Sequence, residues 1–207
     1  IPTEYYNLDV QSIGEYAFYG ANYLHTVTIQ RGTPGFSPYS FANTPSLRYV
    51  LFEGVRDNAL TWIDANAFKN SGLQSITIPK SITYIGEGAF FDSSLNKIIF
   101  ESESKLNHIG TKSFEGASYL SNITIPKSVE SIGEYAFRGT SSLNEVSFEQ
   151  DSQLYRIIDN VFKGSGLKKI TIPNSVNYIE SYAFLDSSLN EVLFEQDSKL
   201  RYIDSYV

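Results

Sequence analysis

An internal repeat runs along this sequence. A phenylalanine recurs eight times at spacings of 22–27 residues, with an apolar anchor residue five positions before each. The phenylalanines are Phe18, Phe41, Phe68, Phe90, Phe114, Phe137, Phe162 and Phe184, and the anchors are Ile13, Phe36, Ile63, Ile85, Ile109, Ile132, Ile157 and Ile179. Five or six residues after each phenylalanine, a leucine opens an L-x-x-[VI]-x-[IF] segment, such as LQSITI at 73–78. A repeat of this kind indicates one structural unit stacked on copies of itself.

From the third unit onward, the repeats alternate between two types. In one type, a proline follows the last apolar residue of the segment (Pro79, Pro126 and Pro173), and the next anchor lies seven residues beyond that apolar residue. In the other type, a glutamate takes that place (Glu101, Glu149 and Glu195), and the gap is nine. Two successive units therefore form a double period of 46–48 residues.

The segments favour β-strands because they are rich in Ile, Val, Thr, Phe and Tyr, which prefer pleated surfaces. Helical repeats are disfavoured because Pro or Gly interrupts nearly every unit. A propeller with blades of about 40–45 residues is disfavoured because the two halves of each double period resemble each other. We therefore predict a β-rich solenoid of about eight coils of 22–27 residues, in which one parallel sheet runs the length of the stack at a strand spacing of about 4.8 Å.

The interior of the predicted solenoid contains the anchor and Ala-Phe residues on one side, and the leucine and the two apolar strand residues on the other. Two irregular stretches, 31–41 and 53–63, depart from the pattern. We interpret them as loop insertions on the solenoid wall, with Trp62 partly covering that wall. A binding spot at these loops is the alternative.

The predicted domain is a single solenoid spanning residues 1–207. The chain contains no Met, Ile1-Pro2 resembles the tail of an earlier strand, and a ninth unit begins at Leu200 and stops at Val207. We therefore expect a piece of a longer array, interrupted at both ends, which associates end to end or has frayed terminal coils.

Composition excludes several classes of function. Apolar residues make up 42% of the chain, which is enough to bury a core. The net charge of −7 argues against nucleic-acid partners and anionic membrane surfaces. No apolar run approaches the roughly 20 residues of a membrane-spanning helix. The absence of Cys removes disulfides and zinc–thiolate sites.

The segments LSNITIPKSVESIGEYAF (120–137) and LKKITIPNSVNYIESYAF (167–184) closely resemble the BspA-type leucine-rich repeat. The resemblance extends from about residue 8 onward. It implies a right-handed leucine-rich-repeat superhelix with its parallel sheet on the concave side and no catalytic residues. It also implies a surface protein of anaerobic bacteria or mucosal parasites, several of which adhere to host matrix proteins or cells. The chain departs from the family pattern just after the Ala-Phe pair, where Gly, Ala, Ser or Thr replaces a common Cys.

Few residues point to catalysis or to a cofactor. His25 and His108 are 83 residues apart, so we interpret both as solvated side chains and not as a metal or catalytic pair. Phosphate-loop and nucleophile-elbow motifs do not occur. The acidic loops at 101–106, 149–154 and 195–200 raise the hypothesis of a Ca²⁺ stripe. It is disfavoured because alternate coils lie about 10 Å apart and each loop offers too few of the six to eight ligands that Ca²⁺ takes. We predict a protein without enzymatic activity and without a cofactor.

The outward residues of the strands form the candidate ligand-binding face. Leu51, Ile99 and Leu193 are apolar on an otherwise polar strand face, which is consistent either with a recognition patch or with ordinary scattered surface residues. Glu145, Lys169 and Glu191 are lateral neighbours of alternating charge, which favours a structural ladder. The complete candidate set is Tyr49, Leu51, Lys97, Ile99, Glu145, Lys169, Glu191 and Leu193.

These observations predict a non-enzymatic module of a cell-surface or secreted adhesin-like protein that binds host or matrix proteins through the solenoid face. The alternative is a structural spacer that projects another domain from the cell surface.

Overall fold

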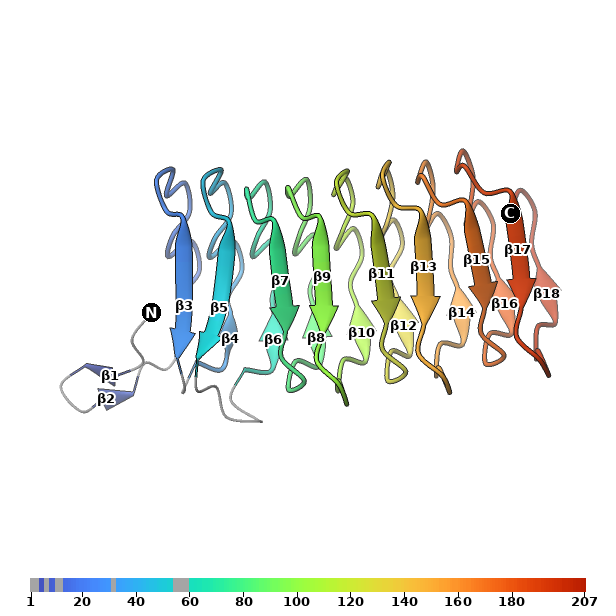
Figure 1. The fold of residues 1–207 in the computed structure, drawn as a ribbon, viewed down its shortest axis with the longest axis horizontal. Coiled ribbons are helices and arrows are strands. Elements are labelled where there is room, and N and C mark those ends of the chain that lie inside the picture. Colours follow the sequence, from blue (N-terminus) through green and yellow to red (C-terminus); the bar gives the residue numbers. More distant parts are fainter. Residues whose placement is uncertain (1–3, 6–7, 10–12, 31–32, 54–59) are drawn as a thin grey trace.

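The computed structural model describes residues 4–5, 8–9, 13–30, 33–53 and 60–207, and it shows one elongated stack of coils (Figure 1). One wall of the stack is a row of eight long strands, one from each L-x-x-[VI]-x-[IF] segment. They are β3 (Thr26–Gln30), β5 (Tyr49–Glu53), β7 (Ser75–Ile78), β9 (Lys97–Phe100), β11 (Asn122–Ile125), β13 (Glu145–Phe148), β15 (Lys169–Ile172) and β17 (Glu191–Phe194). From the first long strand to the eighth is seven full turns, which is close to the predicted count and confirms the solenoid.

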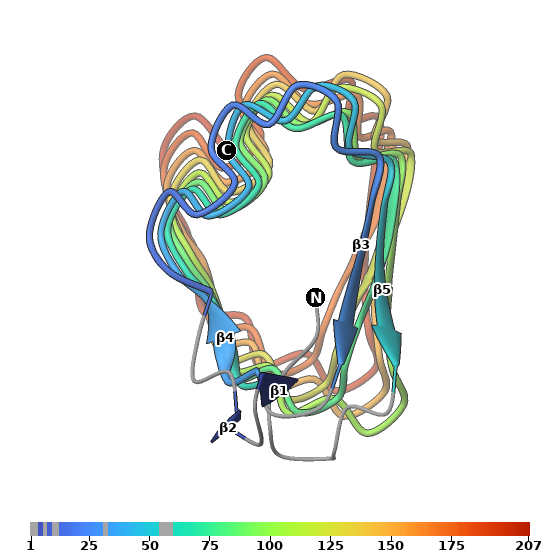
Figure 2. The ribbon, with the colours of Figure 1, turned by 90° about the vertical axis from the view of Figure 1, so that its left-hand side faces the viewer.

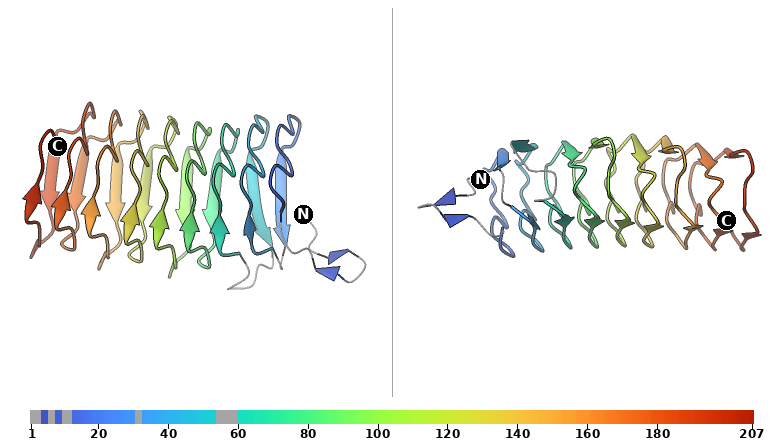
Figure 3. Two further views of the ribbon diagram at one scale, coloured as in Figure 1. Left: turned by 180° about the vertical axis from the view of Figure 1, so that it is seen from behind. Right: turned by 90° about the horizontal axis from the view of Figure 1, so that it is seen from below.

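A second wall consists of two-residue strands, each of which ends at an anchor residue. They are β4 (Gly35–Phe36), β6 (Trp62–Ile63), β8 (Tyr84–Ile85), β10 (His108–Ile109), β12 (Ser131–Ile132), β14 (Arg156–Ile157), β16 (Tyr178–Ile179) and β18 (Tyr202–Ile203). Seen along the stack, the coils superimpose on one another, with long strands on one side and short strands on the other (Figure 2). A small antiparallel hairpin of β1 (Glu4–Tyr5) and β2 (Leu8–Asp9) lies at the N-terminal end, as Figure 3 shows from two further directions.

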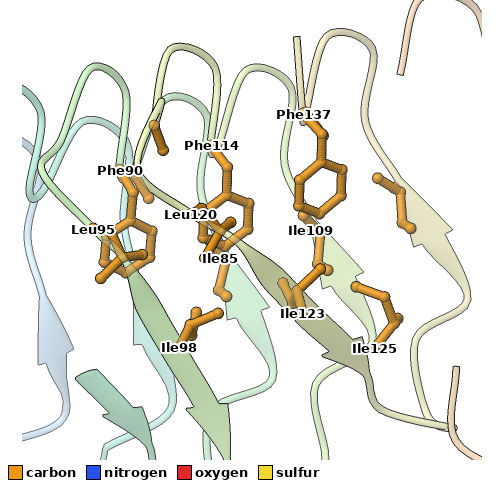
Figure 4. Packing of buried hydrophobic residues seen from close by; sticks show 14 of the residues in the cluster. Ile85, Phe90, Leu95, Ile98, Ile109, Phe114, Leu120, Ile123, Ile125 and Phe137 are labelled. Atoms are coloured by element: carbon orange, nitrogen blue, oxygen red, sulfur yellow. The ribbon is translucent and has the colours of Figure 1, made fainter. Parts of the chain in front are cut away.

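The interior contains the predicted spine of phenylalanine rings. Phe90, Phe114 and Phe137 are fully buried and stack in parallel, with ring centroids 5.3 Å apart at each step (Figure 4). The same stacking runs from Phe18 to Phe184 at 4.9–5.5 Å per step. Anchors such as Ile109 and opening leucines such as Leu120 are fully buried beside the rings, as predicted. A single coil could not bury these side chains, so stacking supplies the hydrophobic stabilisation of the fold.

The turn around each phenylalanine is held by hydrogen bonds to the next coil. The amide of Phe114 donates to the carbonyl of Ala136 at 2.8 Å, and the amide of Gly116 donates to the carbonyl of Arg138 at 2.9 Å. These bonds require left-handed backbone two residues before and two residues after each phenylalanine, as at Tyr135 (φ 60°) and Gly139 (φ 68°). Gly, Asn and Asp fill most of these positions because they adopt this conformation at low cost.

The long strands do not form the single continuous sheet that the sequence analysis predicts. They form two four-stranded sheets, β3-β5-β7-β9 and β11-β13-β15-β17, with no register pairing between β9 and β11. Within each sheet, full pairing alternates with weak pairing. β7–β9 pairs at four positions, whereas β5–β7 pairs at one and β13–β15 at two. The long strands are therefore fully hydrogen-bonded only in successive pairs. The junctions after β5, β9 and β13 have few or no register pairs and are here called open junctions.

Proline contributes to this alternation at the C-terminal end of the strands. Where glutamate follows a strand, its amide bonds back to the preceding coil. The Glu101 amide, for example, donates to the carbonyl of Ile78 at 3.0 Å. At the open junctions, the aligned residue is Pro79, Pro126 or Pro173. Because proline has no N–H, that bond cannot form.

Turn length contributes at the N-terminal end of the strands. The opening leucine follows its phenylalanine by six residues in the first two coils, by five in the next two, then again by six and by five. Neighbouring coils with equal turns, such as those of Leu73 and Leu95, pair fully, and the open junctions are the places where the turn length changes. A one-residue difference shifts the point at which a strand can begin to pair with its neighbour.

The irregular stretches are only partly described. Residues 1–2, 31–32 and 54–59, on which several of the sequence interpretations rest, lie outside the described residues. Trp62 does lie on the short-strand wall, where its ring packs directly over Gly35 and leaves no room for a side chain there. The described part of the chain contains no helix that could span a membrane.

Candidate functional site

The structure places all eight candidate residues on the outer surface of the long-strand wall, here called the strand face. The three apolar candidates are about half exposed, at 46% for Leu51, 44% for Ile99 and 40% for Leu193. Their register partners Thr28, Thr77 and Thr171 also lie on the strand face. The prediction that these apolar side chains point outward is confirmed, whereas their role in binding stays a prediction.

The apolar candidates do not form one continuous patch. Leu51 on β5 and Ile99 on β9 are two coils apart, and Leu193 on β17 is four coils beyond Ile99. On β13, midway between Ile99 and Leu193, the equivalent residue is the polar Ser147, whose hydroxyl lies 3.0 Å from the hydroxyl of Thr124. The strand face therefore offers separate apolar points on a polar background.

The predicted charge ladder is present in part. Lys169 and Glu191 form an ion pair with 3.0 Å between Nζ and Oε2, and Glu145 is the register neighbour of Lys169 on the other side. Both ion-pair partners are about half exposed, so the pair contributes at most about 1 kcal/mol. Lys97 differs, because its register neighbour on β7 is Ser75.

The open junctions form clefts in the strand face, which the sequence analysis does not predict. The cleft between β9 and β11 has a volume of about 320 Å³ and is lined by Lys97, Ile98, Ile99, Phe100, Asn122, Ile123, Thr124 and Glu149. The cleft between β13 and β15 has a volume of about 210 Å³ and is lined by Glu145, Val146, Ser147, Phe148, Lys169, Ile170, Thr171 and Glu195. Equivalent residues of the double period line both clefts. Four of the eight candidate residues, Lys97, Ile99, Glu145 and Lys169, lie in these clefts.

The acidic loops have a structural role. The Glu101, Glu149 and Glu195 carboxylates each accept a hydrogen bond at 2.9 Å from the amide of Lys80, Lys127 or Asn174, in the turn of the preceding coil. Each glutamate thus caps a proline-type turn, which uses one of the oxygens that a Ca²⁺ ion would need. Among the described residues, no group of three or more His, Asp or Glu side chains is arranged to hold a metal ion.

On the short-strand wall, aromatic side chains at the residue before the anchor stack in two separate pairs, here together called the aromatic ladder. Tyr84 stacks on His108 with centroids 5.3 Å apart, and Tyr178 stacks on Tyr202 at 5.1 Å. The guanidinium of Arg156 lies 4.8 Å from the centroid of Tyr178. Sequence reasoning missed this ladder, although the position before each anchor reads Trp, Tyr, His, Ser, Arg, Tyr and Tyr from residue 62 onward. Each stacked ring covers one face of its neighbour, which stabilises this wall, while Tyr84 and Tyr202 remain 38% and 61% exposed.

His108 is not the solvated side chain that the sequence analysis describes. It is partly buried against Tyr84, and its Nδ1 lies 2.7 Å from the hydroxyl of Ser131. Burial lowers the pKa of His108 below its ordinary value of 6.5. His25 is exposed on the first described coil, with its Nδ1 2.7 Å from the carbonyl of Tyr23. His25 thus lies next to β3 (Thr26–Gln30) and His108 on β10, in different coils.

A row of carboxylates flanks the C-terminal part of the ladder. Burial, together with the neighbouring charges of Glu180, Glu134 and Asp204, raises the pKa of Asp159. Arg156 pairs with Glu180 at 3.1 Å and compensates part of this negative charge. These carboxylates and Arg156 form a charged part of the surface beside the ladder.

Comparisons with known proteins agree with this architecture. The BspA type leucine rich repeat region matches residues 5–120 and 107–207 in six copies. The pneumococcal vaccine antigen PcpA is 25% identical, with a TM-score of 0.70 over 99% of this chain and 59% of that one. A leucine-rich repeat protein from Bacteroides ovatus is 23% identical, with a TM-score of 0.62 over 100% of this chain and 63% of that one. The T. pallidum leucine rich repeat protein TpLRR is 21% identical, with a TM-score of 0.58 over 90% of this chain and 74% of that one.

No curated protein sequence matches the chain. The chain spans about three fifths of the length of PcpA and of the Bacteroides protein. Leucine-rich-repeat folds are generally non-enzymatic. The repeat match extends over nearly the whole chain, and the coil it describes is the coil observed. The chain therefore belongs to the BspA-type leucine-rich-repeat family.

Proposed function

We propose that this chain is a non-enzymatic protein-binding module of a cell-surface or secreted adhesin-like protein, and that it recognises host or matrix proteins through the strand face. The observation that carries the proposal is the exposure of Leu51, Ile99 and Leu193 on a rigid, otherwise polar surface. Apolar side chains that remain half exposed on a preorganised surface can be desolvated by a partner at a small entropic cost.

The surface location is supported by similarity to PcpA. That protein is described as a vaccine antigen, and a vaccine antigen is a molecule that antibodies can reach. The family match supports a role in recognition, because stacked repeats create an extended surface over which many weak contacts add up.

The test is binding of the purified chain to a panel of purified extracellular-matrix proteins, measured by surface plasmon resonance. The variant Leu51→Glu/Ile99→Glu/Leu193→Glu should weaken binding to a matrix partner at least about tenfold, because three apolar contacts are each worth more than a few tenths of a kcal/mol. The control Tyr19→Glu/Tyr119→Glu/Tyr155→Glu adds the same charge at exposed aromatic residues away from the strand face and should leave binding unchanged.

Two results would contradict the proposal. If the control variant weakens binding as much as the strand-face variant does, recognition does not use the strand face. If no matrix protein binds the chain, the spacer function gains support. Circular dichroism of both variants shows whether the solenoid is intact.

A further inference from the structure

The cleft between β9 and β11 is the largest interruption of the strand face for which the structure gives a volume. The two strands share no register pair, whereas β7–β9 and β11–β13 on either side each pair at four positions. The cleft is therefore bounded by two well-paired strand pairs and is a fixed feature of the stack. Figure 1 shows the wider separation of β9 and β11 at the centre of the molecule.

One end of this cleft carries an uncompensated positive charge. Within the described part of the chain, no carboxylate lies within ion-pair distance of Lys97. In the cleft between β13 and β15, the residue equivalent to Lys97 is Glu145 on β13. The lysine of that cleft, Lys169 on β15, is already paired with Glu191. The two clefts thus have the same construction, but only the first has a cation that is available to a ligand.

The remainder of the cleft is apolar. Ile99 is 44% exposed, and Phe100 is only half-buried although it closes the strand at an inward position. The volume of about 320 Å³ is at the lower end of the range for ligand pockets, which fits one large side chain and a neighbouring group. A ligand that satisfies both parts of the cleft needs an apolar group beside an anion.

We propose that this cleft binds a peptide segment of the partner protein in which a carboxylate stands next to a large apolar side chain. The carboxylate pairs with Lys97, and the apolar side chain lies over Ile99 and Phe100. This inference rests on the proposed function and specifies the chemistry of one contact on the strand face.

The charges at the two ends of the cleft favour a peptide as the ligand. The end opposite Lys97 is negatively charged. There the carboxylate of Glu149 already accepts the Lys127 amide and adds a negative charge. A ligand that is anionic along its whole length, such as a nucleic acid, would be repelled at that end. A peptide can carry its carboxylate at the Lys97 end only.

The experiment uses the full chain labelled with ¹⁵N and three probes: N-acetyl-Asp-Phe-amide, N-acetyl-Lys-Phe-amide and N-acetyl-Asp-Ala-amide. We expect the Asp-Phe probe to bind with millimolar affinity and to shift the amide resonances of Ile99, Phe100 and Thr124 more than those of other residues. The Lys-Phe probe should bind about two- to fivefold more weakly, which is the effect of one exposed ion pair. The Asp-Ala probe should be weaker still because it leaves the apolar floor uncovered.

Variants separate the two contacts. Lys97→Glu should reverse the preference between the Asp-Phe and Lys-Phe probes, whereas the matched control Lys169→Glu should leave it unchanged. Thr124→Phe keeps a strand-forming residue on β11 while filling the cleft, and it should abolish the localised shifts. Retained dispersion of the remaining resonances shows that each variant is folded.

The inference is overturned if the Asp-Phe probe gives no shifts localised to the cleft, or if Lys97→Glu leaves the preference as it was. These results would not affect matrix binding by the whole strand face, which the Leu51, Ile99 and Leu193 variant tests separately. Conversely, probe binding without any matrix partner would support the cleft and contradict the proposed function.

Discussion

At the scale of single residues, each position of the coil has one physical role, and this role is repeated with small chemical changes. The third residue after each phenylalanine shows this well. In the described coils it is always small, and it is buried in the six coils from Thr44 to Ser165. Thr44 and Thr140 satisfy their hydroxyls by donating to the carbonyl three residues earlier at 2.7 Å. Ser71, Ser93 and Ser165 occupy the same position without a hydrogen-bond partner.

This difference predicts opposite effects of alanine at equivalent positions. Ser93→Ala should stabilise the chain by about 1 kcal/mol, because a buried hydroxyl without a partner costs about 1–3 kcal/mol. Thr140→Ala should instead destabilise the chain by about 1–2 kcal/mol through the loss of a hydrogen bond and a buried methyl group. Equilibrium urea unfolding measures both. Destabilisation by Ser93→Ala would mean that its hydroxyl does have a partner.

His108 makes the stability of the chain depend on pH. Its pKa is lowered in the folded state because it is buried against Tyr84, so the unfolded chain takes up a proton more readily. The stabilisation is therefore present above the unfolded pKa of about 6.5 and is lost as the pH falls through the lower folded value. His108→Phe keeps the stack on Tyr84 and removes the titrating group. The free energy of unfolding of the variant should fall less between pH 7 and pH 5 than that of the original chain. An NMR titration that placed the His108 pKa above 6.5 would contradict this prediction.

At the scale of elements, the long-strand wall and the interior spine of phenylalanine rings have different natural spacings. Hydrogen-bonded strands lie about 4.8 Å apart, whereas most of the stacked phenylalanine rings repeat every 5.3–5.5 Å. Opening every second junction of the strand wall reduces this mismatch. Pro126 and the change from a five-residue to a six-residue turn place the widest opening between β9 and β11.

Restoring one amide should therefore close part of the central cleft. Pro126→Ala supplies an N–H at the position where Glu101 and Glu149 bond back to the preceding coil. We expect this new amide to be protected from hydrogen exchange and the cleft probe Asp-Phe to bind more weakly. Stability should change by less than about 1 kcal/mol, because the gained bond offsets the lost rigidity of proline. If the new amide exchanges as fast as that of an exposed loop, turn length alone keeps the junction open.

In the unaltered chain, the strands should differ in their rates of amide hydrogen exchange. The amides of β11 that face β9 should exchange faster than the amides of β9 that face β7, because the first junction lacks register pairs and the second has four.

At the scale of the whole molecule, the last coil differs from those before it in exposure. Val192, Phe194 and Ile203 are 39%, 46% and 57% exposed, whereas the equivalent Val146 and Ile157 of earlier coils are buried. These side chains form an apolar surface of the kind that a further coil covers elsewhere in the stack. We therefore propose, as the sequence analysis expects, that this chain associates end to end.

This proposal predicts the oligomeric state of a chain of residues 1–207. Sedimentation velocity at increasing concentration should show association, and Ile203→Glu should shift the chain toward monomer. Glu substitution at Tyr119, which is similarly exposed but lies away from this end, is the control. A chain that stays monomeric at all concentrations, with an ordered last coil, would contradict the prediction.

The structure of one coil can be predicted from the spacing of residues along the chain. Because each unit contacts only its neighbours, a fixed spacing of Phe, Ile and Leu is sufficient to predict which side chains stack inside and which, like Ile99, point out. The alternation of Pro and Glu is visible in the sequence, but its effect is not. Whether Pro126 opens a junction depends on which carbonyl lies opposite it and on the spacing of the phenylalanine spine in the interior. The clefts, the capping role of Glu149 and the contact of His108 with Tyr84 join residues of different coils, so they become visible only once the coils are stacked.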